Sequence, residues 1–220
     1  MVEPQVMRAR LVEGAIRLVD EHGAEGLQVR KLAAAVGTST MAVYTYFSGM
    51  PGVLAAVRAE GYRRVTARVS AVPPSDDPVA DVVSGALAYR QAAVDGPHLF
   101  ALAFARASPT DVSLEGERTA AEEGRAGFGV LRTVVRRAID AGRFTVVDVR
   151  SAATQLWCSH HGVVVLEMSG FLRADPGYAV SEVLLPQTVS LAVGFGDDPA
   201  AARRSAELGL RNWERFAAAQ

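Results

Sequence analysis

The sequence predicts an all-α protein with two helical domains, and three observations support this fold class. Ala, Arg, Glu and Leu, which favour helices, are abundant, and the alternating apolar and polar runs typical of strands are almost absent. Apolar residues instead recur every three or four positions, in stretches that glycine and proline interrupt. Half of the chain is apolar, which allows it to bury a substantial core.

Four helices are expected at the N-terminal end, over residues 5–22, 29–36, 40–47 and 51–69. Gly23 and Gly37 are expected to end the first two helices, because glycine is favoured just after a helix C-terminus. Thr38 and Ser39 can cap the third helix. Pro51 fits the first turn of the fourth, where a missing N–H costs nothing.

The segment 71–78 holds three prolines and two aspartates and is the clearest break in the chain. We therefore predict a head over residues 1–70 and a body over residues 71–220. Apolar periodicity predicts six helices in the body, over residues 79–95, 98–107, 114–141, 147–172, 178–193 and 199–219.

Composition limits the classes of protein to consider. No apolar run approaches the roughly 20 residues that a membrane-spanning helix needs. The charged N-terminus is not followed by the apolar stretch of a secretory signal. We therefore expect a cytoplasmic protein that has no membrane partner.

Charge is unevenly distributed along the chain. The formal net charge is −1, but residues 1–70 carry nine basic and six acidic side chains, or +3, which leaves −4 for the remainder. A mildly basic head is compatible with binding to phosphates, although so small an asymmetry decides nothing alone.

Two short helices joined by the turn 37–39, and braced by a longer first helix, are the elements of a helix-turn-helix DNA reader. Val43 and Phe47 lie four positions apart in the third helix and can face the core. The other face then presents four side chains outward: Thr40, Met41, Tyr44 and Thr45. Hydroxyl groups at such positions can reach phosphates or base edges.

The residues that carry a family resemblance are Gly26-Leu27, Leu32-Ala33, Val36-Gly37-Thr38-Ser39, Val43-Tyr44, Tyr46-Phe47 and Leu54. Through them, residues 7–58 resemble the N-terminal domain of the TetR family of repressors. The resemblance implies that Tyr44 and Tyr46 contact the DNA backbone. With the outward face, it gives eight candidate DNA contacts: Gln28, Lys31, Ser39, Thr40, Met41, Tyr44, Thr45 and Tyr46.

Two positions depart from the family pattern. Met50 stands where the family usually carries a lysine near the start of the fourth helix, and Gln28 replaces the usual Ser or Thr cap of the second. Each change removes a phosphate contact, so DNA binding is expected to be weaker or less dependent on salt. Backbone amides at the start of the fourth helix can still bind a phosphate.

The body contains the string Trp157-Cys-Ser-His-His161-Gly162, with Glu167 following. It is similar to the Trp-His-Gly (WHG) pattern of one class of TetR C-terminal domains, which implies a ligand-receiving helical bundle. Trp157 and His161 share a helical face. His161 can bond a ligand or respond to pH, or it can be a core histidine bonded to a backbone carbonyl. Gly162 is expected to allow close helix approach.

Bulky side chains on helices that should converge are candidates for a ligand pocket: Tyr89, Phe100, Phe104, Phe128, Trp157 and His161. The alternative is that most of them are simply core, because apolar pockets and cores use the same residue types. Few charged residues are expected inside, which favours a lipophilic or aromatic effector.

A metal site and an enzyme are the alternatives to this interpretation. Cys158 and His161 can share a face, and His160 and His98 are further donors, but no set of four ligands at defined spacing is present. The chain has no nucleophile elbow, phosphate-binding glycine loop or carboxylate–histidine metal pattern, so catalysis would depend on residues such as His161 and Glu167. We therefore expect no metal, no cofactor and no enzymatic activity.

The family resemblance implies a homodimer that binds palindromic operator DNA, with heads one helical turn (~34 Å) or a multiple apart. The helices 147–172 and 178–193 would form its interface. The second is unusually apolar, so either a partner covers it or the C-terminal helix with Trp213 covers it within one chain. An effector bound in the body would shift the helix 53–69, change the spacing of the heads and release the DNA.

Overall fold

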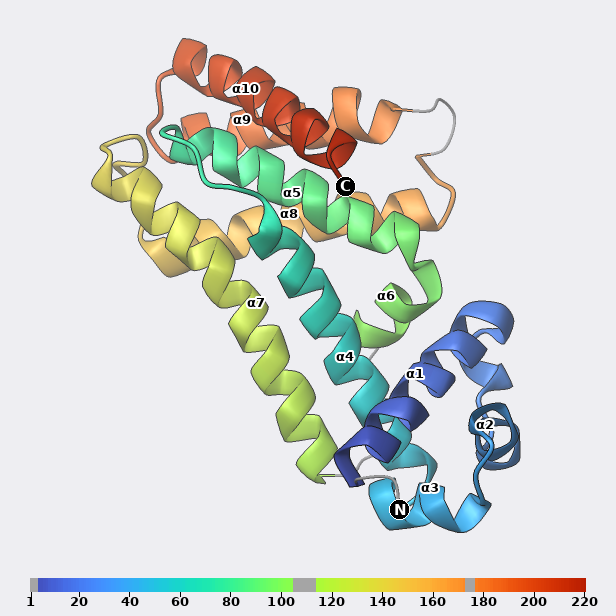
Figure 1. The fold of residues 1–220 in the computed structure, drawn as a ribbon. Helices are drawn as coiled ribbons and strands as arrows, with labels where there is room; N and C mark the ends of the chain where they lie inside the picture. Colours follow the sequence, from blue (N-terminus) through green and yellow to red (C-terminus); the bar gives the residue numbers. More distant parts are fainter. Residues whose placement is uncertain (1–3, 105–113, 173–176) are drawn as a thin grey trace. The chain divides into compact units, whose positions relative to one another are not determined.

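The chain folds almost entirely into helices (Figure 1). The computed structural model describes residues 4–104, 114–172 and 177–220, with side chains throughout except at 114–117. These residues form ten α-helices, one 3₁₀ turn and one π-helical segment. The all-α prediction is confirmed. No helix in the described ranges is long and apolar enough to cross a membrane.

The chain divides into two compact units. Unit 1 contains residues up to Arg64 and the described part of 95–126, and unit 2 contains residues 65–94 and 127–220. Two long helices, α4 (Met50–Ala71) and α7 (Leu114–Asp140), contribute to both units. The division therefore differs from the one expected at residue 70, because a segment from beyond that point packs with the N-terminal helices.

Besides parts of α4 and α7, unit 1 consists of α1 (Pro4–His22), the 3₁₀ turn η1 (Ala24–Gly26), α2 (Val29–Val36), α3 (Thr40–Phe47) and α6 (Pro97–Phe104). The predicted helices of the head are found within one or two residues. Helix α6 was expected to reach residue 107, and residues 105–107 lie outside the described ranges.

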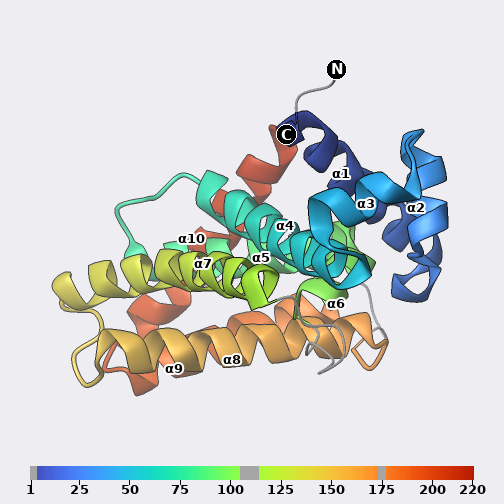
Figure 2. The same ribbon diagram turned by 90° about the horizontal axis from the view of Figure 1, so that it is seen from below.

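One continuous apolar cluster holds unit 1 together. Leu11 and Val19 of α1, Leu32 of α2 and Val43 of α3 are fully buried in it. Leu99 of α6 joins the same cluster, so this helix supports the N-terminal helices. Helices α2 and α3 pack against one another, and α1 packs against α2 (Figure 2).

The turn between α2 and α3 depends on Gly37. Its φ and ψ of 68° and 42° are left-handed, a region that glycine enters without steric cost. The amide of Thr38 then bonds to the carbonyl of Ala33 at 2.9 Å and closes the end of α2. The predicted role of this glycine is confirmed, and it sets the direction in which α3 leaves the turn.

Unit 2 contains the remaining parts of α4 and α7 with α5 (Pro78–Asp95), α8 (Val149–Met168), the π-helix η2 (Ala179–Leu184), α9 (Leu185–Gly194) and α10 (Pro199–Ala218). Helix α8 ends four residues before the predicted Leu172. The helix expected over 178–193 begins with the π-helical segment. Pro186 lacks an N–H and its ring blocks regular α-winding of the preceding turn, which accounts for the change in helix type.

Helix α10 covers much of the apolar face of η2 and α9 within the chain. Trp213 of α10 lies in one buried cluster with Ala179 and Leu184. Helices α10 and α5 approach closely at Gly209, where an added Cβ would lie 2.5 Å from the carbonyl oxygen of Ala80. Of the two explanations for the apolar segment, the intrachain one therefore applies to these residues.

Buried polar side chains fasten the segment before α5 to the rest of unit 2. Asp81 accepts hydrogen bonds from the amide and hydroxyl of Ser75 and pairs with Arg137 at 2.5 Å. Arg143 makes a forked ion pair with Asp197, at 2.6 and 2.7 Å. The segment predicted as the boundary between head and body is thus held in place by polar and ionic contacts within unit 2.

Candidate nucleic-acid interface and ligand site

Helix α3 presents one buried and one exposed face. Val43 is fully buried and Phe47 is 6% exposed, so both anchor the helix in the core of unit 1. Met41 is 69% exposed and Tyr44 55% exposed, and Thr40 and Thr45 are also exposed. Large side chains on a short, anchored helix form a surface that can enter a DNA groove.

Local hydrogen bonds fix both ends of α3. The Ser39 hydroxyl accepts from the amide of Ala42 at 3.3 Å, which confirms Ser39 as the cap. Ser48 takes a left-handed conformation with φ of 57°, and its amide bonds to the carbonyl of Tyr44 at 2.9 Å. The Thr45 hydroxyl donates to the carbonyl of Met41 at 3.0 Å and keeps acceptor capacity only.

The other predicted contacts lie on or near α2. Gln28 occupies the N-cap position, is exposed and makes no capping bond with its side chain. Lys31 is exposed one turn further along. Tyr46 differs from the rest, because it is half-buried and packs against the core of unit 1. Seven of the eight predicted contacts are therefore exposed or at a helix cap, and their roles stay predictions.

Two arginines of α1 lie against the ends of α2 and α3 and were missed by sequence reasoning. The guanidinium of Arg8 lies 5.0 Å from the centre of the Phe47 ring, at the last residue of α3. Arg10 donates to the carbonyl of Val36, the last residue of α2, at 3.0 Å. The sequence shows that the two arginines lie close together on one helix, but it does not indicate which other helices their side chains contact.

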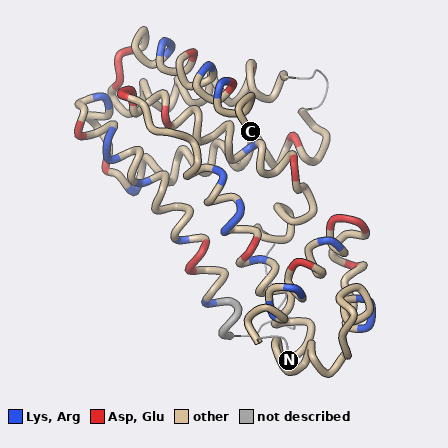
Figure 3. The backbone as a smooth tube through the Cα atoms, viewed as in Figure 1, with Lys and Arg blue, Asp and Glu red and all other residues tan. Residues whose placement is uncertain are grey.

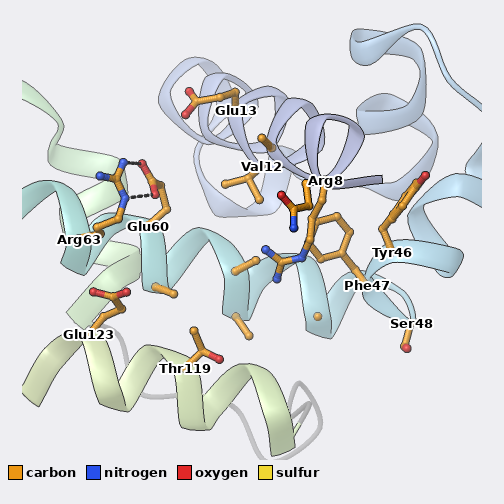
Figure 4. A pocket seen from close by; sticks show the side chains of 16 residues that line it. Arg8, Val12, Glu13, Tyr46, Phe47, Ser48, Glu60, Arg63, Thr119 and Glu123 are labelled. Carbon is orange, nitrogen blue, oxygen red and sulfur yellow. Dashed lines mark hydrogen bonds and ion pairs between the residues drawn. The ribbon is translucent and has the colours of Figure 1, made fainter. Parts of the chain in front are cut away.

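A pocket of about 570 Å³ opens in unit 1 beside Arg8 (Figure 4). Its floor is made of small residues of α4, and its rim carries Tyr46, Ser48 and Arg63. Arg63 pairs with Glu60 at 2.5 and 2.7 Å. Burial alone would raise the pKa of Glu60, but hydrogen bonds from Arg63 and Arg64 hold it below its usual value.

Four of the six predicted ligand residues form a connected group in unit 2. The Tyr89 hydroxyl and His161 Nδ1 are 2.7 Å apart. The Trp157 ring lies 5.9 Å from the His161 ring and 6.0 Å from that of Phe128, centre to centre. Burial lowers the pKa of His161, which favours the neutral ring near pH 7. The group combines aromatic faces with a hydrogen-bonding pair.

The other two predicted ligand residues lie in unit 1. Phe100 and Phe104, both on α6, have ring centres 4.7 Å apart, and the Phe104 ring meets that of Tyr62 at 4.9 Å. Phe100 is almost fully buried. The six residues therefore fall into two groups rather than one.

An ion pair that lies next to the Tyr89–His161 group of unit 2 was also missed by sequence reasoning. Arg90 of α5 makes a forked pair with Glu167 of α8, and both side chains are largely buried. Arg90 directly follows Tyr89, so α5 supplies a hydroxyl and a guanidinium to the same helix, α8. A separation of 77 residues between the partners hides such a pair from sequence inspection.

His160 is a structural histidine between α8 and α9. The Thr188 hydroxyl donates its proton to the carbonyl of Leu184 at 2.8 Å, so it can only accept from His160 Nε2, 2.9 Å away. Full burial lowers the pKa of His160 to about 4. The ring is therefore neutral near pH 7, with the proton assigned to Nε2 by this network.

The structure tests two further expectations about residues of α8, which concern Gly162 and Cys158. Gly162 was expected to allow close helix approach, and this was wrong, since among the described residues nothing lies within 4 Å of an added Cβ. Cys158 is exposed, and no three potential metal ligands gather within the described ranges.

Several apolar side chains remain exposed at the end of α8 and just beyond it. Val165 and Leu166 are each 45% exposed, Phe171 is 76% exposed and Tyr178 is 41% exposed. All four belong to unit 2 and lie in the segments predicted to form a dimer interface.

Two family profiles match the chain. One, described as "Bacterial regulatory proteins, tetR family", matches residues 11–57. The other, described as "Tetracyclin repressor-like, C-terminal domain", matches residues 82–185. The first covers α2, α3 and the capped turn, and the second covers the Tyr89–His161 group.

Curated relatives are transcriptional regulators. The uncharacterized HTH-type transcriptional regulator Rv0681 of Mycobacterium tuberculosis is 30% identical over 174 residues, which cover 76% of this chain and 73% of that protein. The HTH-type transcriptional repressor DrrR1 of Streptomyces coeruleorubidus is 43% identical over 47 residues, 21% of this chain and 17% of that protein.

Solved structures share the fold over most of the chain. A protein of unknown function from Rhodococcus sp. RHA1 has a TM-score of 0.74 at 25% identity, covering 87% of this chain and 96% of that one. RolR in complex with resorcinol has a TM-score of 0.64 at 19% identity, covering 93% and 94%.

Proposed function

Because the chain belongs to the TetR family of bacterial transcriptional regulators, we propose that it is a ligand-responsive repressor. As a homodimer it binds a palindromic operator, and a small lipophilic or aromatic effector releases it. The family consists of regulators and not of enzymes, in agreement with the prediction that the chain has no catalytic activity. Operator DNA places this action in the cytoplasm.

The exposed face of α3 is the single observation that carries the proposal. Met41 and Tyr44 extend into solvent from a helix that Val43 and Phe47 anchor firmly. Met41 and Tyr44 lie three positions apart and therefore share one exposed face of α3, so together they form a contact surface for a binding partner. Their hydroxyl, ring and thioether groups suit backbone contacts and thymine methyl groups in a major groove.

The proposed dimer rests on the exposed apolar side chains of unit 2. Val165 and Leu166 of α8, with Phe171 and Tyr178 beyond its end, are apolar side chains that the described part of the chain leaves exposed. A two-fold interface buries the same patch on both copies. Two heads related in this way read two half-sites of a palindrome.

The proposed effector site is the group of Tyr89, Phe128, Trp157 and His161. Neutral His161 and the tyrosine hydroxyl offer directed hydrogen bonds beside two aromatic faces. This composition suits an aromatic molecule with a polar substituent. RolR, which shares the fold, was solved with resorcinol, a molecule of this kind. Assignment of the body to the Trp-His-Gly class belongs to the same proposal.

Selection from genomic DNA tests the proposal without knowledge of the operator. Sheared DNA from the source organism is mixed with the protein, and bound fragments are recovered and sequenced. We expect enrichment of fragments with inverted half-sites whose centres lie about 10 bp or a multiple apart. Aromatic compounds that release these fragments then identify the effector class. Equal recovery of all fragments would contradict the proposal.

A further inference from the structure

The second half of α2, the turn and α3 carry no charged side chain. From Leu32 to Val57 there is no Lys, Arg, Asp or Glu, a stretch that includes most of α2, all of α3 and the start of α4. Figure 3 shows this as an uninterrupted tan segment through α3. Duplex DNA carries one negative charge per ~1.7 Å, and proteins bind it largely by neutralising phosphates. Cations beside α3 must therefore come from the start of α2, where Arg30 and Lys31 lie, or from neighbouring elements.

Arg8 places a cation at the C-terminal end of α3. Its guanidinium lies over the ring of Phe47, and Figure 4 shows it beside the turn into α4. The side chain is exposed and makes no ion pair with a carboxylate of any described residue. Its charge is thus held in position while remaining available to an anion.

Arg10 places a second cation at the C-terminal end of α2. One nitrogen, Nη2, donates to the carbonyl of Val36, just before the turn at Gly37. The other guanidinium N–H groups make no bond to the described residues. Since Arg8 and Arg10 are two positions apart on α1, they point to different sides and reach different helices.

Both positions are where a DNA-binding head needs positive charge. The C-terminal end of a helix carries a negative partial charge that would repel a phosphate. Helix α3, with eight residues, is about 12 Å long, which equals the ~12 Å width of the major groove. With α3 in the groove, the phosphate backbones run past its two ends, beside these arginines.

Building on the proposed function, we propose that Arg8 and Arg10 are phosphate-binding residues of this protein. They supply positive charge beside the uncharged segment 32–57, one on each side of the groove. Stacking on Phe47 and the bond to Val36 orient the two guanidinium groups before DNA arrives, so little side-chain entropy is lost on binding.

Salt dependence of binding tests this directly, even without the operator. Fluorescence anisotropy measures binding to a labelled duplex of arbitrary sequence, about 30 bp long, at several salt concentrations. The proteins are the wild type, Arg8→Gln, Arg10→Gln and the charge-matched Arg204→Gln on α10. The charge-retaining variants Arg8→Lys and Arg10→Lys complete the set.

Each Gln variant is expected to reduce the slope of log K against log salt by about 0.9, with a Kd five- to ten-fold higher near 0.1 M salt. The Lys variants and Arg204→Gln are expected to keep the wild-type slope. A variant that is partly unfolded binds less DNA at every salt concentration, but its slope does not change. The slope therefore separates phosphate contact from a structural role.

Wild-type slopes in both Gln variants would overturn the assignment of Arg8 and Arg10, even if their affinity fell. If Tyr44→Ala abolished binding in the same series, the proposed function would stand without these two contacts. Absence of any salt-dependent binding by the wild type would overturn both the proposed function and this inference.

Discussion

The two units of the chain are stabilised in different ways. The core of unit 1 is an apolar cluster, and in its arginine ion pairs, such as Arg64 with Glu13, the arginine side chain is well exposed. Unit 2 also has apolar clusters, but every buried polar or charged side chain among the described residues belongs to it: Asp81, Ser84, His160, Thr188, Asp197 and Ser205.

This difference matches the two proposed tasks. An apolar core holds α3 in a fixed orientation, while the outer face of this helix stays exposed. Buried polar groups require fixed partners, so they couple helices that are distant in sequence and respond to charge and pH. The stability of unit 2 is therefore expected to depend more strongly on changes of charge and pH than the stability of unit 1.

The largest effect is expected from a buried ion pair of unit 2. Asp197→Ala removes the forked partner of Arg143, which keeps its contacts to Asp77 and Ser205, and should lower the free energy of unfolding by about 3–4 kcal/mol. Glu13→Ala, which breaks an exposed pair of unit 1, should cost less than about 1 kcal/mol. Denaturant unfolding followed by circular dichroism measures both. If both variants lost the same free energy of unfolding, ion pairs would contribute equally to the stability of the two units, which would contradict this account.

Acid should destabilise unit 2 through His160. Unfolding raises its pKa from about 4 to about 6.5, so between these pH values the unfolded chain is protonated at this histidine and the folded chain is not. Stability is thus complete above pH 6.5 and falls, by up to about 3 kcal/mol, as the pH drops to 4. The wild type should lose more stability over this range than His160→Met, which cannot titrate. If the stability of both proteins changed with pH in the same way, the assignment of this acid sensitivity to His160 would be wrong.

A smaller effect is expected where helices of unit 2 touch. Gly209→Ala forces a methyl group against the backbone of α5 and should cost about 1–3 kcal/mol. Gly162→Ala, on the uncrowded side of α8, should leave stability unchanged or raise it by up to about 1 kcal/mol. Thermal unfolding of the pair checks this, and a loss in Gly162→Ala as large as that in Gly209→Ala would show a contact at α8.

The smallest effect is expected at the cap of α3 in unit 1. Ser39→Ala removes the bond to the Ala42 amide and should cost about 1 kcal/mol. Ser39→Asp keeps a capping oxygen but adds a negative charge beside the DNA, so it should retain stability and weaken DNA binding. If Ser39→Asp bound DNA as tightly as the wild type, the α3 N-terminus would not lie near phosphates.

Local features of the molecule were predictable from sequence. Helix ends follow from Gly37, Ser39 and similar residues, because capping and left-handed turns depend on neighbours in the chain. The burial of Val43 and Phe47 follows from helical spacing. The outward residues of α3 were found for the same reason.

Contacts between distant segments were not predictable. Tyr89 and His161 are both candidates for a ligand site from the sequence, but nothing in the sequence indicates that they bond across 72 positions. Phe100 and Phe104 looked like members of the same group, yet they lie in unit 1, since periodicity shows that a face is buried and not what it is buried against. The π-helical start before Pro186 was missed because one proline perturbs the winding of the preceding turn.

A titration of an enriched genomic duplex with the wild type and Tyr44→Ala tests the central claim, that the exposed face of α3 reads DNA. Because Tyr44 is 55% exposed, its loss should leave the unfolding temperature unchanged while weakening binding by roughly ten-fold or more. Tyr89→Phe, in unit 2, should bind the same duplex normally but lose release by the effector. Wild-type affinity in Tyr44→Ala would contradict the account.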